Sequence, residues 1–482
     1  MLPRLIQGGM GAGVSGWALA REVARLGQLG VVSGTALDTI LVRRLGEGDP
    51  DGHMRRAMAA FPVPQVAATI LRKYFRPEGR PAKPGEPRFK LVPLARARMT
   101  DERAWLLVMA SFVEVYLAKV GHDGAVGINF LHKIQLPVLP GLYGAMLAGA
   151  DAVLMGAGIP AEIPGVLDRL AQHEAVRVPL DVLGAGDEKF ELSFDPASLW
   201  AGSGCTPPEI ARPAFLAIVS SATLARALLK KAPGGIAGFV VEAPVAGGHN
   251  APPRGAQQLT SRGEPLYGQR DEVDPADMLA LGVPFWLAGG FASRERFEAA
   301  VGAGARGIQV GTVFAFCEES GLDPGLRRRF LEAAMDGRTE IFTDPDASPT
   351  SFPFKVAALD GTLSEAGRYA ERGRLCDLGY LRRAYRKDDG SLGYRCPAEP
   401  VDDYVKKGGK AEDTVGRKCL CNGLMSNIGL GQTRADGYTE PALLTAGNDL
   451  ACITPFVTQD RPWYHARDVV GALVPAGAGG AV

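Results

Sequence analysis

Short runs of apolar residues recur along the first two thirds of this chain, and small residues follow most of them. The first run, Leu5-Ile6-Gln7, leads into the glycine-rich segment 8–13. Runs that are apolar at nearly every position are typical of parallel strands covered on both faces of a sheet. The runs that we expect to be strands are 5–7, 30–34, 126–130, 152–155, 176–182, 215–219, 238–242, 285–288 and 307–310.

Segments with helical periodicity separate most of these runs, and residues 36–120 are expected to be mostly helical. We expect helices over 38–45, 52–60, 64–75, 101–120, 140–150, 162–173, 223–231, 275–281 and 293–301. We expect irregular structure near 184–212. Eight or so strand–helix units in roughly 320 residues favour an α/β fold, a (β/α)8 TIM barrel with insertions, over a doubly wound sheet. In a barrel, the strand-end residues would converge at one mouth: Met10, Asn129, Glu242, Gly289 and Gln309.

The pattern changes after residue 340. Residues 343–359 are rich in Pro, Ser and Phe, and 376–421 carry four cysteines among many charges. This part has too little apolar periodicity to predict an independent core. We therefore predict a barrel over 1–340, including the helical insertion 36–120, and an appendage over 341–482 packed on the barrel.

Charge and cysteine usage narrow the class of protein. Lys and Arg number 53, as do Asp and Glu, so the sequence predicts neither a nucleic-acid partner nor an anionic membrane surface. The first residues do not follow a signal-peptide pattern, and no long uncharged apolar span is present. With seven cysteines, this favours a cytoplasmic protein whose thiols are reduced or bound to metal.

The four cysteines of the appendage are the candidate metal ligands. Cys376, Cys396, Cys419 and Cys421 are separated by 19, 22 and 1 residues, which matches no common zinc pattern of paired Cys-x2-Cys knuckles. We favour reduced structural thiols here, and a zinc ion or an iron–sulfur cluster is the less favoured alternative.

Two strand ends have the composition of a phosphate site. Segments 283–290 and 305–312 each end in small residues, and in TIM barrels the loops after the last two strands commonly bind phosphate. Glycine N–H groups and the Thr312 hydroxyl suit a dianion, although tight turns without a ligand would look similar. Pyridoxal phosphate would need a lysine at a strand end. None of the expected strands carries one, and the nearest candidate, Lys133, lies three residues after its strand. The Gly11-Ala12-Gly13 segment lacks the dinucleotide-binding spacing, so flavin mononucleotide (FMN) is favoured.

Five segments in order, 6–15, 126–130, 242–249, 287–290 and 307–314, resemble the signature of the nitronate monooxygenase (2-nitropropane dioxygenase) family of FMN proteins. Relatives of that family include FMN-dependent enoyl-acyl-carrier-protein reductases and trans-acting enoyl reductases. The resemblance covers about residues 1–355. It implies a TIM barrel that binds one FMN without a covalent bond and oxidises a small-molecule substrate.

The resemblance also implies roles for individual residues. His249 would be the catalytic base or proton donor facing the flavin. The residues implied in cofactor binding are Gly9, Met10, Gly11, Asn129, Glu242, Gly247, Gly248, Gly289, Gly290, Gln309, Gly311 and Thr312. Within this set, residues 9–11 would offer backbone contacts, Asn129 its side chain, and the glycines from 289 onward, with Gln309 and Thr312, would hold the ribityl phosphate.

The sequence departs from the family pattern in ways that bear on the substrate. Gly8-Gly9-Met10 replaces the usual Ala-Pro-Met, Val240 stands where a glutamine is frequent, and Pro244-Val245 lengthens the path from Glu242 to His249. Oxidation of a nitronate or nitroalkane with dioxygen is favoured. The alternative is reduction of an enoyl thioester, with a nicotinamide as second substrate and a carrier protein as partner. A third alternative is a partner protein that binds flavin without catalysis. The sequence is also compatible with a homo-oligomer.

Overall fold

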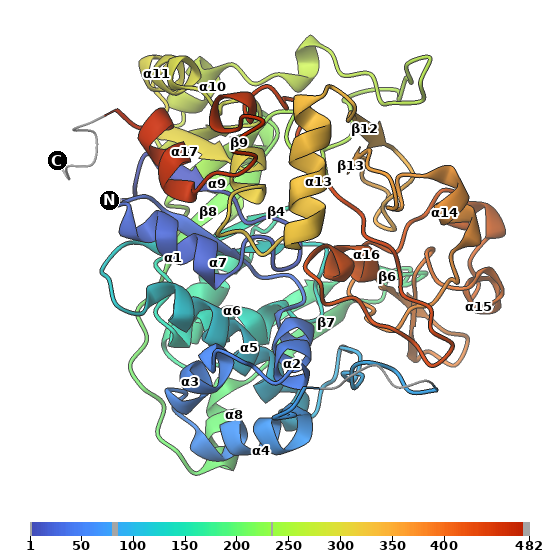
Figure 1. The fold of residues 1–482 in the computed structure, drawn as a ribbon. Helices are drawn as coiled ribbons and strands as arrows, with labels where there is room; N and C mark the ends of the chain where they lie inside the picture. Colours follow the sequence, from blue (N-terminus) through green and yellow to red (C-terminus); the bar gives the residue numbers. More distant parts are fainter. Residues whose placement is uncertain (1, 80–84, 233–234, 476–482) are drawn as a thin grey trace.

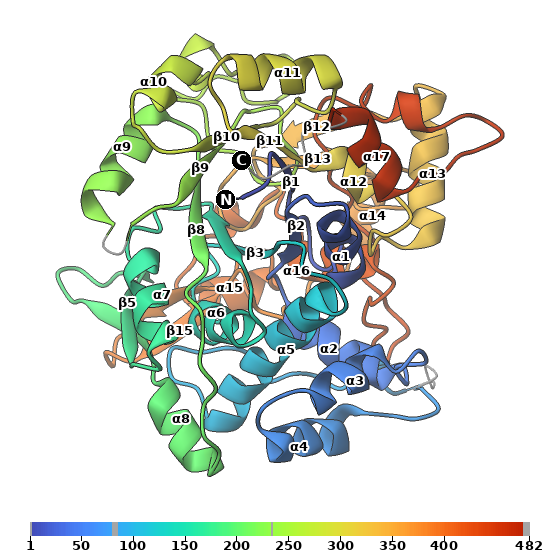
Figure 2. The ribbon, with the colours of Figure 1, turned by 90° about the vertical axis from the view of Figure 1, so that its left-hand side faces the viewer.

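The computed structural model describes residues 2–79, 85–232 and 235–475, and eight parallel strands form its centre. Neighbouring strands pair in the order β1-β11-β10-β9-β8-β4-β3-β2, and a bridge between Ile6 and Leu29 joins the two ends. Figure 2 shows these strands around one axis with helices outside them. The predicted TIM barrel is confirmed. The strands are β1 (Leu5–Gln7), β2 (Gly30–Ser33), β3 (Val126–Leu131), β4 (Ala152–Gly156), β8 (Ala214–Val219), β9 (Gly238–Glu242), β10 (Phe285–Ala288) and β11 (Gly307–Val310).

The strands bury apolar side chains on both faces, as parallel strands between two layers require. One cluster fills the barrel, and its larger members are Ile6, Leu154, Leu216, Val240 and Trp286. A second, much larger cluster lies between the strands and the surrounding helices. The barrel interior is therefore packed, and within the described residues the cavity large enough for a ligand lies at the strand ends.

The outer helices follow the expected pattern. Those of the insertion are α2 (Leu37–Gly46), α3 (His53–Ala59), α4 (Pro64–Tyr74) and α5 (Asp101–Lys119). The Thr100 hydroxyl accepts the Arg103 N–H and begins α5, as the sequence predicts. The remaining helices around the barrel are α1 (Trp17–Arg25), α6 (Val138–Leu147), α7 (Ile163–Ala171), α9 (Ala222–Lys231), α10 (Pro275–Leu279), α11 (Arg294–Gly302) and α12 (Thr312–Ala315), with a 3-10 turn, η1 (Gln269–Asp271).

Between residues 176 and 212, the expected strand is present, but it lies outside the barrel, and the segment that we expected to be irregular contains a strand and a helix. Strand β5 (Val176–Leu180) pairs antiparallel with β7 (Phe190–Phe194) in a separate hairpin, and α8 (Pro196–Ser203) follows it. Alternate residues of β5 are exposed, among them Arg177 and Pro179. A strand with one face exposed to solvent is typical of such an antiparallel hairpin rather than of a parallel barrel.

Most of the elements after residue 320 lie beside the barrel, orange to red in Figure 1, whereas the last helix, α17 (Ala466–Leu473), packs against α1 and α11. Contacts with the barrel part include the Tyr380 hydroxyl donating to Asp38 Oδ1 at 2.7 Å, and Arg43 donating to the Leu430 carbonyl. The elements are α13 (Pro324–Met335), β12 (Ile341–Asp344), β13 (Phe354–Ala357), α14 (Ala366–Glu371), β14 (Arg383–Arg386), β15 (Leu392–Arg395), α15 (Val401–Lys406), η2 (Ala411–Thr414), α16 (Leu420–Asn427), η3 (Thr454–Phe456) and α17 (Ala466–Leu473), and β14 also pairs with β6 (Val182–Leu183).

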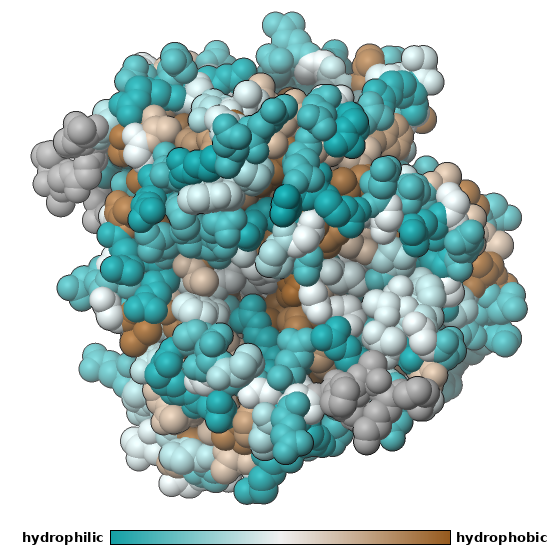
Figure 3. All heavy atoms as spheres, in the orientation of Figure 1, coloured by the Kyte–Doolittle hydropathy of each residue, from teal (hydrophilic) through white to brown (hydrophobic). Residues whose placement is uncertain are grey.

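The face shown in Figure 3 is mostly hydrophilic, and its apolar residues form separate small patches. Among the described helices, none combines the length and apolar character needed to cross a bilayer.

Candidate active site

A cavity of about 500 Å³ opens at the carboxyl ends of the barrel strands. Its wall contains His249 and every residue that the resemblance assigned to the flavin, although these residues come from five separate segments of the sequence. The cavity is large enough for a cofactor-sized ligand. The strand ends therefore meet as predicted.

The loop after β1 is fixed by two buried polar side chains. Gln7 accepts the Val31 N–H at 3.0 Å through Oε1 and donates to the Ser15 hydroxyl at 2.9 Å through Nε2. Ser15 in turn accepts the Met10 N–H and donates to the Gly8 carbonyl, both at 2.9 Å. This network holds the backbone of residues 8–11 against the cavity.

Gly9 lies where a side chain cannot fit. A Cβ atom at Gly9 would be 2.4 Å from the Cβ of Asn129, which lies in β3 on the neighbouring wall. The close approach leaves a flat stretch of backbone facing the cavity beside the buried Asn129 amide. A planar ring system could stack on such a surface, so the residues present fit the isoalloxazine of FMN.

The loops after β10 and β11 form the candidate phosphate cradle. Gly289 and Gly290 both have left-handed backbones, with φ of 88° and 76°, so their N–H groups belong to a concave turn of the kind that binds anions. Gln309 Oε1 is buried without a hydrogen-bond partner, which marks a polar group awaiting a ligand. The Thr312 hydroxyl accepts the Gly447 N–H at 2.8 Å, and its own proton remains available to a phosphate oxygen. The site fits the predicted ribityl phosphate.

His249 is held by a segment that the sequence interpretation left without a function. Its Nε2 lies 2.7 Å from the Ser348 hydroxyl, which contacts the Thr350 hydroxyl at 2.8 Å. The His249 ring packs edge-on against Phe354 with centroids 4.9 Å apart. Burial, with the nearby charge of Lys133 as a smaller cause, lowers the pKa of His249 to about 4. The imidazole is therefore neutral at physiological pH.

A carboxyl group and an ammonium group lie deeper in the same region. Burial raises the pKa of Glu242, at the end of β9, to about 7, against the opposing effect of Lys355. Burial also lowers the pKa of Lys355 to about 8, and its Nζ donates to the Thr343 hydroxyl at 2.6 Å. Both groups titrate near neutral pH, which is frequent where proton transfer takes place.

The residues after 340 supply one wall of the cavity, which the sequence interpretation missed. Thr445 accepts the Gly248 N–H at 2.9 Å, and Phe352, Asn427 and Asp449 also line the wall. The resemblance assigned Gly247 to the flavin. In the structure, a Cβ at Gly247 would lie 2.9 Å from the backbone of Ala446 and Gly447, so contact with the appendage is what requires a glycine here. One feature of the sequence could have indicated this wall: Lys355 is a single charged residue inside the otherwise apolar strand β13.

The four appendage cysteines also come together. Cys396 and Cys419 are buried, and Cys376 and Cys421 pack against them. Among the residues that the structure describes, however, no group of three or more His, Cys, Asp or Glu side chains is placed to hold a metal ion. A metal at Cys376, Cys396, Cys419 and Cys421 thus has no support from the described geometry.

Part of the chain, including the segment around His249, matches the model of a known protein family. Residues 210–348, which run from β8 to Ser348, match the nitronate monooxygenase family. A probable nitronate monooxygenase of Bacillus subtilis is 36% identical over 110 residues, which are 22% of this chain and 30% of that protein.

A second curated relative is named for a different activity. The (3aS,4S,5R,7aS)-5-hydroxy-7a-methyl-1-oxo-octahydro-1H-indene-4-carboxyl-CoA dehydrogenase of Mycobacterium tuberculosis is 29% identical over 237 residues, 46% of this chain and 63% of that protein. This chain thus matches less than two thirds of either relative's length.

Solved structures give looser similarities. FabK of Thermotoga maritima aligns with 98% of this chain and 91% of its own, at 13% identity and a TM-score of 0.45. The nitroalkane oxidase of Streptomyces ansochromogenes aligns with 98% and 94%, also at 13% identity and a TM-score of 0.45.

Proposed function

We propose that this chain is a nitronate monooxygenase-like oxidoreductase, which holds one FMN non-covalently and oxidises a nitronate or nitroalkane with dioxygen as second substrate. The observation that carries the proposal is His249, which is half-buried in the wall of the glycine-lined cavity and is bonded through Nε2 to the Ser348 hydroxyl. A histidine with a pKa of about 4 accepts a proton at neutral pH but holds none to donate. That protonation state suits oxidation of an acidic C–H compound better than protonation of an enoyl thioester.

The hydrogen bonds around His249 support a role as base. When Nε2 carries the ring proton and donates it to Ser348, Nδ1 has its lone pair available. Within the described residues, Nδ1 has no hydrogen-bond partner. Nδ1 is then the atom that would take the proton from the carbon next to a nitro group. A preformed nitronate would need only orientation.

The remaining cavity residues would bind and orient. Bound FMN would supply the two-electron oxidation chemistry, with dioxygen as the final oxidant. The Lys133 ammonium, close enough to lower the pKa of His249, adds a positive charge that favours an anionic substrate. The residue 8–11 backbone and Asn129 would face the ring system, and the glycines after β10 would hold the phosphate.

A thioester activity is the second candidate, because the Mycobacterium tuberculosis relative is named as a dehydrogenase of a carboxyl-CoA. Here the same His249 would take or return a proton at the carbon next to the thioester carbonyl. A nicotinamide or another electron carrier would be the second substrate, and a carrier protein could present the acyl group.

The two candidates separate in an anaerobic titration of the purified yellow protein. We expect a nitronate to bleach the flavin, whereas NADH and NADPH leave it oxidised. Bleaching by a nicotinamide would move the assignment to thioester reduction. The His249→Gln variant should keep its flavin absorbance and lose most of the bleaching rate, and a colourless variant would mean that His249 serves to hold the fold.

A further inference from the structure

Four cysteines from three separate loops meet at one place away from the flavin cavity. Cys376 follows α14, Cys396 follows β15, and Cys419 and Cys421 lie at the beginning of α16. All four line a small cavity of about 10 Å³. A void of that size holds at most one water molecule, and the four cysteines pack together in one cluster.

Within this cluster, two cysteines are paired more closely than the rest. The Cys376 and Cys396 thiols hydrogen-bond to each other, although their positions are separated by the whole β14–β15 hairpin. A disulfide needs the two Cβ atoms about 3.8 Å apart, so thiols already in hydrogen-bond contact need only small side-chain rotations. All seven cysteines are free in this structure.

The surroundings give the two thiols different chemical character. Cys376 is partly exposed, and its bond to Cys396, with a contribution from the Arg382 charge, lowers its pKa. Cys396 is buried, and both the hydrogen bond and burial raise its pKa well above the ordinary value. An accessible thiol with thiolate character beside a buried neutral one is the arrangement of an attacking and a resolving cysteine.

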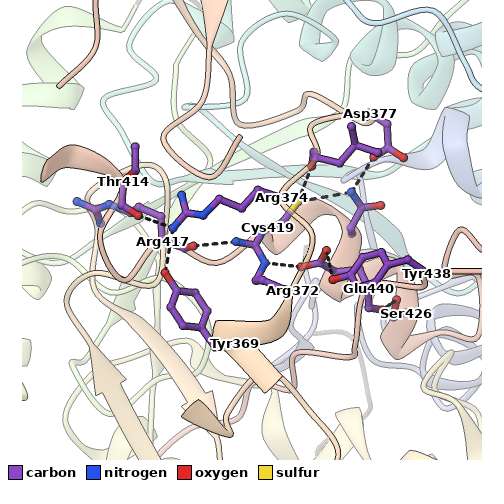
Figure 4. Close-up of polar contacts among 12 residues, drawn as sticks. Tyr369, Arg372, Arg374, Asp377, Thr414, Arg417, Cys419, Ser426, Tyr438 and Glu440 are labelled. Carbon is purple, nitrogen blue, oxygen red and sulfur yellow. Dashed lines mark hydrogen bonds and ion pairs between the residues drawn. The ribbon is translucent and has the colours of Figure 1, made fainter. Parts of the chain in front are cut away.

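The other two cysteines are held as neutral thiols. Cys419 accepts from the Asn422 amide at 3.5 Å and donates to the Leu375 carbonyl at 3.9 Å, and burial raises its pKa to about 12. Figure 4 shows Cys419 within a polar network in which Arg372 reaches Glu440. A thiol that donates to a carbonyl is not a metal-bound thiolate, so this environment favours thiol redox chemistry over coordination.

We propose that Cys376 and Cys396 form a reversible disulfide when the protein meets a hydroperoxide. The Cys376 thiolate attacks the peroxide, whose O–O bond breaks, giving a sulfenic acid and, after one proton is taken up, an alcohol or water. Cys396 then attacks that sulfur, the S–S bond forms, and the hydroxide leaves with the Cys396 proton as water. Overall, two thiols lose two electrons and the peroxide gains them.

The disulfide would lie one short helix away from the flavin cavity. Helix α16 begins beside Cys419, and its Leu424 and Asn427 line the cavity wall. Pulling Cys376 towards Cys396 changes the packing under the start of this helix. The proposal does not depend on which substrate the flavin site oxidises.

The test uses the full-length flavoprotein, reduced and then treated with hydrogen peroxide at a small molar excess. After alkylation and trypsin digestion, we expect one linked pair of peptides, residues 375–382 with residues 396–406, and this link should vanish on reduction. The Cys396→Ser variant should instead trap the Cys376 sulfenic acid, which a dimedone probe detects. Cys421→Ser, within the cluster, and Cys205→Ser, outside it, should both retain the link.

Three results would overturn the proposal: no linked peptide in the wild-type protein, a link that involves Cys419 or Cys421 instead, or a stoichiometric metal ion that keeps the thiols from alkylation. The wild-type measurement decides by itself if a variant fails to fold.

Discussion

Replacing Ser348 by alanine tests whether the appendage sets the tautomer of His249, the proposed catalytic base. The Ser348 side chain is fully buried, and its oxygen lies 2.7 Å from His249 Nε2. In the alanine variant, no water can readily replace the lost acceptor, and a buried unpaired N–H costs about 1–3 kcal/mol. That penalty falls only on the form with the proton at Nε2, which is the form that presents a basic Nδ1.

The population of the active tautomer should therefore fall by about 5- to 150-fold, because each 1.36 kcal/mol changes an equilibrium tenfold. We expect kcat/KM for a nitroalkane to fall by the same factor while the flavin absorbance stays unchanged. The assay is anaerobic flavin reduction followed by stopped flow. The double variant His249→Gln, Ser348→Ala should be no slower than His249→Gln alone, because Ser348 acts through His249. Multiplicative losses, or an unaffected Ser348→Ala, would refute the reasoning.

Three further predictions concern pH, the cofactor and stability. In the Glu242→Gln variant, which lacks the neighbouring carboxyl with its pKa of about 7, kcat/KM for a preformed nitronate should stay flat as pH falls from 7 to about 5 and decline only as the His249 ring, with its pKa of about 4, gains a proton; a limb near pH 6.5 in that variant would contradict this. Gly9→Ala places a Cβ 2.4 Å from the opposite wall, and equilibrium dialysis should show weaker FMN binding; unchanged affinity would exclude this stretch as the ring contact. Arg372→Met leaves Glu440 buried and unpaired, which should lower the free energy of unfolding by about 3–5 kcal/mol in urea, whereas Arg386→Met, at an exposed pair, should cost less than about 1 kcal/mol.

The barrel was predictable because its strands are apolar at nearly every position and most of them end at, or directly before, a glycine. The same criterion failed at residues 176–180, where Val-Arg-Val-Pro-Leu alternates between buried and exposed positions. The run's share of apolar residues correctly predicts a strand. The alternation of buried and exposed positions is what shows that one face of this strand is exposed to solvent. Residues 190–194 alternate similarly and were missed because charges and glycines surround them.

The glycine-rich part of the site was predictable for a related reason. A backbone that must approach a ligand, or adopt a left-handed conformation as at Gly289 and Gly290, tolerates few other residues. The hydrogen bond that holds His249 could not be predicted from the sequence in this way. Ser348 lies 99 positions away, in a segment whose residues are ordinary for a loop. A side-chain hydrogen bond between distant segments depends on the tertiary fold, and single-sequence patterns carry no record of it.

The contacts across residue 340 indicate that the catalytic site cannot be assigned to the barrel alone. The Gly248 carbonyl accepts the Lys355 N–H at 2.9 Å, and the Gly248 N–H is bonded to Thr445. On the phosphate side, Thr312 is bonded to the Gly447 backbone. A barrel ending at residue 340 would leave these groups to water, and it would lose the hydroxyl that orients the His249 ring. The glycines that look like a complete cofactor signature in the sequence therefore line only part of the candidate site, and the appendage supplies the Ser348 hydroxyl that holds the proposed base, His249, in position.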